Sequence, residues 1–141
     1  ILPHKLKATF FTVSLTTALQ LCDHPNIEVI FLGGTLVKNS QISVGGEVIS
    51  RLNEITADLC ILGTNSINTE GITDSDLEAV QVKKAMMRAA KRTVIVTISE
   101  KLNSAQRLRI GELNDLDFLV TELSPTNEQL APYLSSGLII L

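Results

Sequence analysis

Short apolar runs recur along the chain, separated by longer stretches in which apolar and polar residues mix. The runs predict strands at residues 8–13, 27–32, 58–62, 93–98, 117–121 and 137–141. Four of them are nearly continuous in apolar or β-branched residues, which is typical of strands covered on both faces, as in a parallel sheet. We therefore expect a mostly parallel sheet.

The stretches between these runs predict helices at about residues 15–22, 46–55, 76–91, 104–113 and 126–134. The clearest is 76–91, where apolar residues return at three- and four-residue steps from Ala79 to Ala90. Ser75 followed by Glu78 predicts a capping box at its start. Because strands and helices alternate through short connections, the sequence predicts a layered α/β fold with helices on both faces of the sheet.

Composition and charge narrow the class of protein. A chain of 141 residues with 45% apolar and 19% charged residues suits one folded domain. A net charge of −3 offers little to a phosphate backbone, so nucleic acid is a poor partner for this chain. It contains neither a secretory signal pattern nor an apolar run of the roughly 20 residues that cross a bilayer. We therefore expect a cytoplasmic protein without membrane contact.

The two cysteines, Cys22 and Cys60, lie in apolar segments without a CxxC pair or a histidine at zinc-binding spacing. We expect both thiols to be reduced, buried and inert, with no metal site.

Glycines and small polar residues gather where the first four predicted strands end. The carboxyl ends of parallel strands, with the helix N-termini beside them, form the ligand-binding edge of such a sheet. Glycine amides can approach an anion there, hydroxyls can donate to its oxygens, and a lysine adds a full charge. This combination suits a small phosphorylated ligand. The candidate residues are Thr12, Ser14, Gly33, Gly34, Gly63, Asn65 and Lys101.

Each candidate also has a plainer structural interpretation. Ser14 is placed to cap the helix that begins near Leu15. Gly33 and Gly34 can form a turn, and Lys101 can be a solvated surface lysine. Asn65 lies in the segment TNSINTEG, which has a typical turn composition. The residues alone leave these alternatives open.

Motifs of several other functional classes are missing. The chain has no GxGxxG, GxxxxGK[ST] or GxSxG segment. His4 and His24 lie away from the four strand ends, so we do not expect a histidine general base. Asp74 and Asp76 precede the helix at 76–91 and suit the start of a helix.

Three segments resemble, in order, the C-terminal sensor domain of DeoR-family transcriptional repressors over about residues 8–122. They are FLGGTLVKNSQISVGGEVISRL, ADLCILGTNSINTEGITDSDLEAVQVKKAMMRAAKRTVIVTISEKLN and LDFLVTE. The resemblance implies a fold related to ribose-5-phosphate isomerase and the CoA transferases. It also implies a repressor of carbohydrate metabolism in which a phosphorylated sugar modulates DNA binding by a helix-turn-helix domain.

The family's motifs correspond to particular positions of this chain. Its TNS segment corresponds to residues 12–14, with Val13 in place of Asn, and its glycine pair corresponds to Gly33 and Gly34. Its glycine-centred turn corresponds to residues 63–71, and the lysine after the fourth strand is Lys101.

The family's sensor domain normally begins with a strand ending in a DSGTT-like loop, preceded by the helix-turn-helix domain. The resemblance implies that residues 1–141 form the effector-binding domain without either, so that the pocket is incomplete and DNA is contacted only through the N-terminal domain. Helix-turn-helix proteins match paired half-sites, so a homo-oligomer is expected.

The same resemblance supplies an enzymatic alternative. Ribose-5-phosphate isomerases carry a DGADE-like segment where this chain has LGTNS, so their catalytic aspartate corresponds to Asn65 and the next glutamate to Ser66. A further isomerase glutamate corresponds to a position near Lys83. Isomerisation needs a carboxylate base, which an amide cannot replace. We therefore expect a sensor that is not an enzyme and uses no cofactor. A sugar-phosphate isomerase and an oligomerisation module without ligand are the alternatives.

Overall fold

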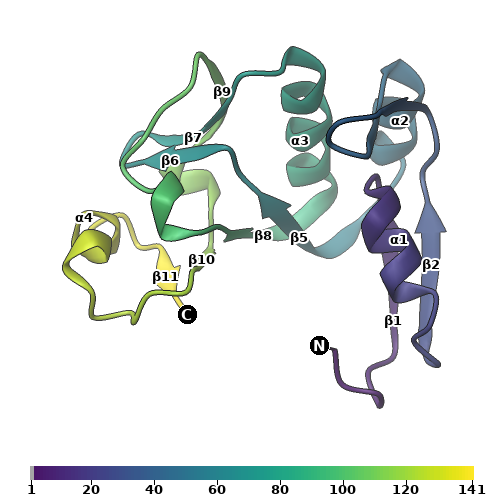
Figure 1. The fold of residues 1–141 in the computed structure, drawn as a ribbon, viewed down its shortest axis with the longest axis horizontal. Helices are drawn as coiled ribbons and strands as arrows, with labels where there is room; N and C mark the ends of the chain where they lie inside the picture. The colour runs from purple at the N-terminus through teal and green to yellow at the C-terminus, as the bar shows by residue number, and fades with distance from the viewer. Residues whose placement is uncertain (1) are drawn as a thin grey trace. The chain divides into compact units, whose positions relative to one another are not determined.

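The computed structural model describes residues 2–141, which fall into two compact units. The first unit ends at Arg51, and the second runs from Leu52 to Leu141. Figure 1 gives the element labels used below, and each unit is described by itself.

The first unit is built on a pair of parallel strands joined by a helix (Figure 1). Strand β1 pairs with β2 from Ala8 opposite Ile27 to Thr12 opposite Phe31. An antiparallel hairpin, β3 with β4, follows, and then helix α2, which runs across the boundary between the units. The bounds are β1 (Ala8–Thr12), α1 (Leu15–Leu21), β2 (Ile27–Phe31), β3 (Thr35–Val37), β4 (Ile42–Val44) and α2 (Gly46–Asn53).

The second unit holds a four-stranded parallel sheet in the order β11-β10-β8-β5, with β5 at one edge. Helix α3 connects the antiparallel sheet β6-β7-β9 to β8. The bounds are β5 (Ala57–Gly63), β6 (Ser66–Asn68), β7 (Gly71–Asp74), α3 (Leu77–Ala89), β8 (Ala90–Val96), β9 (Leu108–Glu112), β10 (Phe118–Val120), α4 (Ala131–Leu134) and β11 (Ile139–Ile140). Three 3-10 helices, η1 (Ser99–Lys101), η2 (Leu113–Asp115) and η3 (Glu128–Leu130), complete it. The predicted α/β class with a mostly parallel sheet is confirmed.

Strand β5 shows how this sheet is packed. Cys60 and Leu62 belong to the main hydrophobic core, which also takes in β8, β10, the β6-β7-β9 sheet and the C-terminal segment. Leu59 and Ile61 alternate with them and are 46% and 52% exposed. Among the described residues, β5 therefore packs one of its two faces into the core, through Cys60 and Leu62.

Tyr133, on α4, belongs to the same hydrophobic core. Its side chain is fully buried, and its hydroxyl lies 3.1 Å from the carbonyl oxygen of Ile67 and 3.0 Å from the backbone nitrogen of Asn103. The hydroxyl thus ties α4 to β6 and to the turn after η1. These contacts stabilise the turn, in which Asn103 adopts a left-handed backbone conformation with φ of 54°.

Two of the predicted helices are wrong or much reduced. Residues 104–113 contain strand β9, which pairs with β7, instead of a helix. Leu108 and Ile110 point the same way along a strand, so pairing with β7 outweighs the mixed composition of this segment. Residues 126–134 form only η3 and the four-residue helix α4. The remaining predicted strands and helices are confirmed to within a few residues.

The start of α3 also differs from the prediction. Asp76, not Ser75, is the N-cap, and its carboxylate accepts hydrogen bonds from the amides of Glu78 and Ala79. The amide of Ser75 is itself bound by Asp74, which fixes the chain one residue earlier. The Asp76 carboxylate accepts two amides at once and favours the positive end of the helix dipole, so it caps the helix in place of the Ser75 hydroxyl.

The cysteine prediction is half right. Cys60 is buried in the core, but Cys22 is exposed at the C-cap of α1. The end of the short helix α1 leaves this side chain outside the packed face, where Ala18 and Leu21 lie. Within residues 2–141, the structure contains no helix long and apolar enough to cross a membrane.

Candidate functional site

Four of the seven candidate residues lie in the first unit, and two of these have structural roles at the end of β1. The hydroxyl of Thr12 accepts a hydrogen bond from the amide of Ser14 at 3.0 Å. The hydroxyl of Ser14 accepts one from the amide of Thr17 at 3.2 Å and so caps α1. Ser14 is thus the helix cap that its position predicts.

The glycine pair after β2 adopts the left-handed backbone region, with φ of 68° at Gly33 and 102° at Gly34. A Cβ atom on Gly34 would collide with the side chain of Val48 and lie 3.0 Å from the carbonyl oxygen of Val44. Gly34 is therefore required by packing of the turn against α2, whatever else it does.

A cation that the sequence interpretation missed lies beside this turn. Arg51, near the end of α2, donates to the carbonyl oxygen of Leu32 at 2.8 Å and pairs with Glu47 at 2.6 Å. Its guanidinium would lie 3.6 Å from a Cβ atom on Gly33. In the sequence, the available signal was an arginine in the helix that follows the glycine pair. This pattern has no fixed spacing and is not specific.

The other three candidates, Gly63, Asn65 and Lys101, lie in the second unit. Gly63 ends β5 and is paired in register with Val96 at the end of β8. The carboxyl ends of these two strands are therefore neighbours, as predicted. Asn65 follows the first strand end and Lys101 follows the second.

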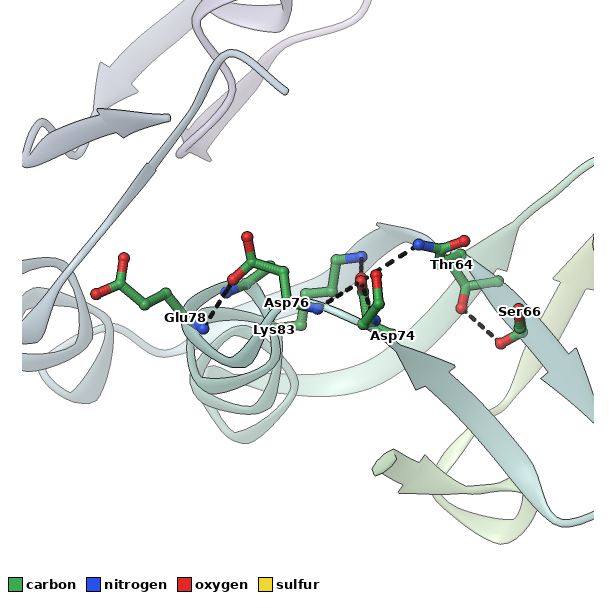
Figure 2. A network of polar contacts seen from close by, with 9 residues as sticks. Thr64, Ser66, Asp74, Asp76, Glu78 and Lys83 are labelled. Carbon is green, nitrogen blue, oxygen red and sulfur yellow. Dashed lines mark hydrogen bonds and ion pairs between the residues drawn. The ribbon is translucent and has the colours of Figure 1, made fainter. Parts of the chain in front are cut away.

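Asn65 belongs to a polar group that we call the Asp74 cluster, formed by Asn65, Asp74 and Lys83. Figure 2 shows Asp74, at the end of β7, and Lys83, on α3, turned toward each other. The Lys83 ammonium lies 2.8 Å from Oδ2 of Asp74, and the Asn65 amide nitrogen lies 3.4 Å from Oδ1. The side chains of Asp74 and Lys83 are only 8% and 18% exposed.

The surroundings of Asp74 keep its carboxylate ionised. Burial alone would raise the pKa of Asp74, but the hydrogen bond and charge of Lys83, together with the amides of Ser75 and Asp76, hold the pKa below its ordinary value. Asp74 and Lys83 therefore form an ion pair at neutral pH. Beside it, the buried hydroxyl of Thr64 donates to the carbonyl oxygen of Ser66 at 2.9 Å (Figure 2).

Lys101 lies at the end of η1 and lines an open depression of about 400 Å³ at the carboxyl ends of β8 and β10. Glu122 lines the same depression, and its carboxylate accepts the amide of Ser99 at 2.9 and 3.0 Å and the hydroxyl of Thr121 at 2.6 Å. These hydrogen bonds from Ser99 and Thr121 lower the pKa of Glu122 to about 2. The depression that Lys101 lines thus already contains a carboxylate.

Comparison with known proteins gives the class of this chain. Residues 1–123 match the family described as the DeoR C terminal sensor domain. The chain therefore belongs to the DeoR family and corresponds to the C-terminal sensor domain of these transcription regulators.

Individual relatives agree with this assignment. The chain is 33% identical over 117 residues to the HTH-type transcriptional repressor GlcR of Bacillus subtilis, covering 83% of this chain and 45% of that protein. It is 29% identical over 116 residues to the glycerol-3-phosphate regulon repressor of Haemophilus influenzae, covering 82% and 45%. It is 30% identical over 112 residues to the HTH-type transcriptional regulator GlpR of Haloferax volcanii, covering 79% and 44%. The chain spans about half the length of these relatives.

Proposed function

We propose that this sensor domain binds a phosphorylated sugar, and that binding modulates DNA binding by a helix-turn-helix domain of the same regulator. The observation that supports the proposal is that β5 and β8 end side by side, with Gly63 paired to Val96, in a chain of this family, and that Asn65 and Lys101 follow these two strand ends in the sequence. A named relative, the glycerol-3-phosphate regulon repressor, supports a phosphorylated effector.

Lys101 is the proposed contact for the phosphate in the second unit, and Asn65 for the sugar. An effector controls DNA binding only if it prefers one of two arrangements of the regulator, because equal affinity for both shifts neither population.

We further propose that residues 1–141 are the effector-binding part of a longer regulator that also contains a helix-turn-helix domain and a preceding sheet strand. The repressors of Bacillus subtilis and Haemophilus influenzae, of whose length the chain spans 45% each, support a longer regulator. The proposed regulator acts as a homo-oligomer on paired DNA half-sites.

Binding without turnover is supported by the chemistry of the Asp74 cluster. Asn65 offers an amide where an isomerase needs a carboxylate base. Asp74 is the nearest carboxylate, but its oxygens accept hydrogen bonds from Lys83, Asn65 and two backbone amides. Its lowered pKa makes it a weak base.

The test is titration calorimetry of the full-length protein with glucose 6-phosphate, fructose 6-phosphate, ribose 5-phosphate and glycerol 3-phosphate. We expect at least one to bind and Lys101→Ala to weaken it about tenfold, the loss of one charge-assisted hydrogen bond. Lys91→Ala is the control, because Lys91 is an exposed lysine on β8 paired with Asp58. Absence of binding across the panel would refute the proposal. Conversion of ribose 5-phosphate to ribulose 5-phosphate would favour the isomerase instead.

A further inference from the structure

We propose that the Asp74 cluster recognises a hydroxyl group of the effector's sugar, not its phosphate. In this arrangement Lys83 donates a hydrogen bond to the hydroxyl oxygen, the carbonyl oxygen of Asn65 accepts one from the hydroxyl's O–H, and Asp74 holds Lys83 in place. The inference rests on the proposed function and adds Lys83 as a specificity residue and Asp74 as a positioning residue.

The first argument is that both carboxylate oxygens of Asp74 are already engaged by the protein. Its Oδ1 accepts the amides of Ser75 at 2.7 Å and Asp76 at 3.3 Å, and its Oδ2 accepts the ammonium of Lys83. These backbone contacts fix the carboxylate at the junction of β7 and α3. Asp74 therefore orients Lys83 and has little capacity left to bind a ligand itself.

The second argument comes from the groups that remain available. A lysine ammonium has three N–H donors, and among the described residues Asp74 is the one acceptor to which Lys83 donates a hydrogen bond. The amide nitrogen of Asn65 faces Asp74, so its carbonyl oxygen is directed elsewhere. The cluster thus presents donors and an acceptor together. A hydroxyl can accept from one and donate to the other, whereas a phosphate dianion can only accept.

The third argument is electrostatic. The charge of Lys83 is balanced by Asp74 at 2.8 Å, and the pair is largely removed from water. A phosphate brought to Lys83 would be repelled by the carboxylate behind it, and this repulsion is screened less than at the surface. A neutral hydroxyl meets no such penalty. The 3.4 Å contact of Asn65 is long for a hydrogen bond, so Asp74 constrains Asn65 less tightly than it constrains Lys83 at 2.8 Å.

The experiment measures the ratio between the affinities for the tightest-binding sugar phosphate of the panel and for inorganic phosphate, with the full-length protein. The variants are Asn65→Ala and the double variant Asp74→Asn with Lys83→Met, which leaves no unbalanced buried charge. The control is Asp58→Asn with Lys91→Met, which removes an exposed ion pair of the same type. We expect the ratio to fall about tenfold in both cluster variants, with phosphate affinity retained.

A purely structural role for the cluster predicts a different pattern. If both affinities fall by the same factor, or if the ratio is unchanged, the inference is wrong while the proposed function stands. If the double variant fails to fold, the affinity ratio of Asn65→Ala tests the inference alone. This variant is expected to fold, because it removes only the long 3.4 Å hydrogen bond. If no sugar phosphate binds the unmodified protein, the proposed function fails and the inference with it.

Discussion

Replacing Tyr133 by Phe removes one hydroxyl from the buried end of the second unit. The aromatic ring stays in place, so no cavity forms, and the change in stability reports the hydroxyl alone. That hydroxyl accepts the amide of Asn103 and lies within hydrogen-bonding distance of two acceptors, the Ile67 carbonyl oxygen and Oδ1 of Asn103. It carries one proton and can donate to only one of them at a time.

The structure limits the size of the loss. The Ile67 carbonyl keeps a second partner, the amide of Ser104 at 3.2 Å. Asn103 is an exposed residue, so water can replace part of what its amide loses. We therefore expect Tyr133→Phe to lower the free energy of unfolding by about 1–2 kcal/mol, within the range for a buried hydrogen bond whose partners are partly re-satisfied. Tyr133→Ala, which also empties the ring's space, should cost about 3–5 kcal/mol.

Urea unfolding followed by far-UV circular dichroism measures both changes, and an unchanged urea dependence would show that the folded and unfolded states keep their compactness. Thr9→Val is the matched control, because the Thr9 hydroxyl makes an exposed hydrogen bond to Glu28. A loss for Tyr133→Phe no larger than that of the control, or as large as that of Tyr133→Ala, would refute the reasoning.

Three further predictions concern other residues of the chain. Gly71→Ala should lower the free energy of unfolding in urea by about 3 kcal/mol, because φ is 138° there and a Cβ atom would lie 2.8 Å from Cα of Glu112 on β9. Gly46→Ala is the control: a Cβ atom there has open space around it, so this substitution should be neutral or stabilising. Folding lowers the pKa of Asp74, so its ionised carboxylate stabilises the protein fully above the ordinary aspartate pKa of about 3.9, and this contribution is lost as the pH falls through the lower folded pKa. The loss of unfolding free energy caused by Asp74→Asn should therefore shrink as the pH falls through that window. A loss that stays constant with pH would contradict this. Cys22 should react rapidly with a thiol reagent in the native protein, while Cys60, whose pKa burial raises to about 12, should react only after unfolding.

The sheet strands were the part of the fold that the sequence predicted best. Strands that pack in a parallel sheet are long apolar runs, and such runs stand out against the rest of the chain. Strands β3, β4, β6 and β7 have three or four residues each and include polar side chains, so no periodic pattern separates them from turns. Strand β9 was predicted as a helix because its five residues are too few to distinguish the two periods.

The candidate site was predicted in part for a related reason. Residues that follow strand ends can be located once the strands are known, which is how Asn65 and Lys101 were selected. Asp74 and Lys83 are in contact because β7 ends with Asp74 just before α3 begins, and Lys83 lies in the second turn of α3. Since β7 was not predicted, Asp74 was assigned to the helix start and its partnership with Lys83 was missed.

The hydrogen bonds of Glu122 have a consequence for how any anion would bind beside Lys101. The amide of Ser99 is not an open coordination position, because a carboxylate from the same chain already occupies it. An anion that bound the Ser99 amide would displace Glu122 from it, and the free energy of binding would be the difference between two similar interactions. Affinity at the Ser99 amide would then depend on how firmly Glu122 is held there, so removing the Thr121 hydroxyl, which donates to Glu122 at 2.6 Å, would alter anion affinity without touching the anion.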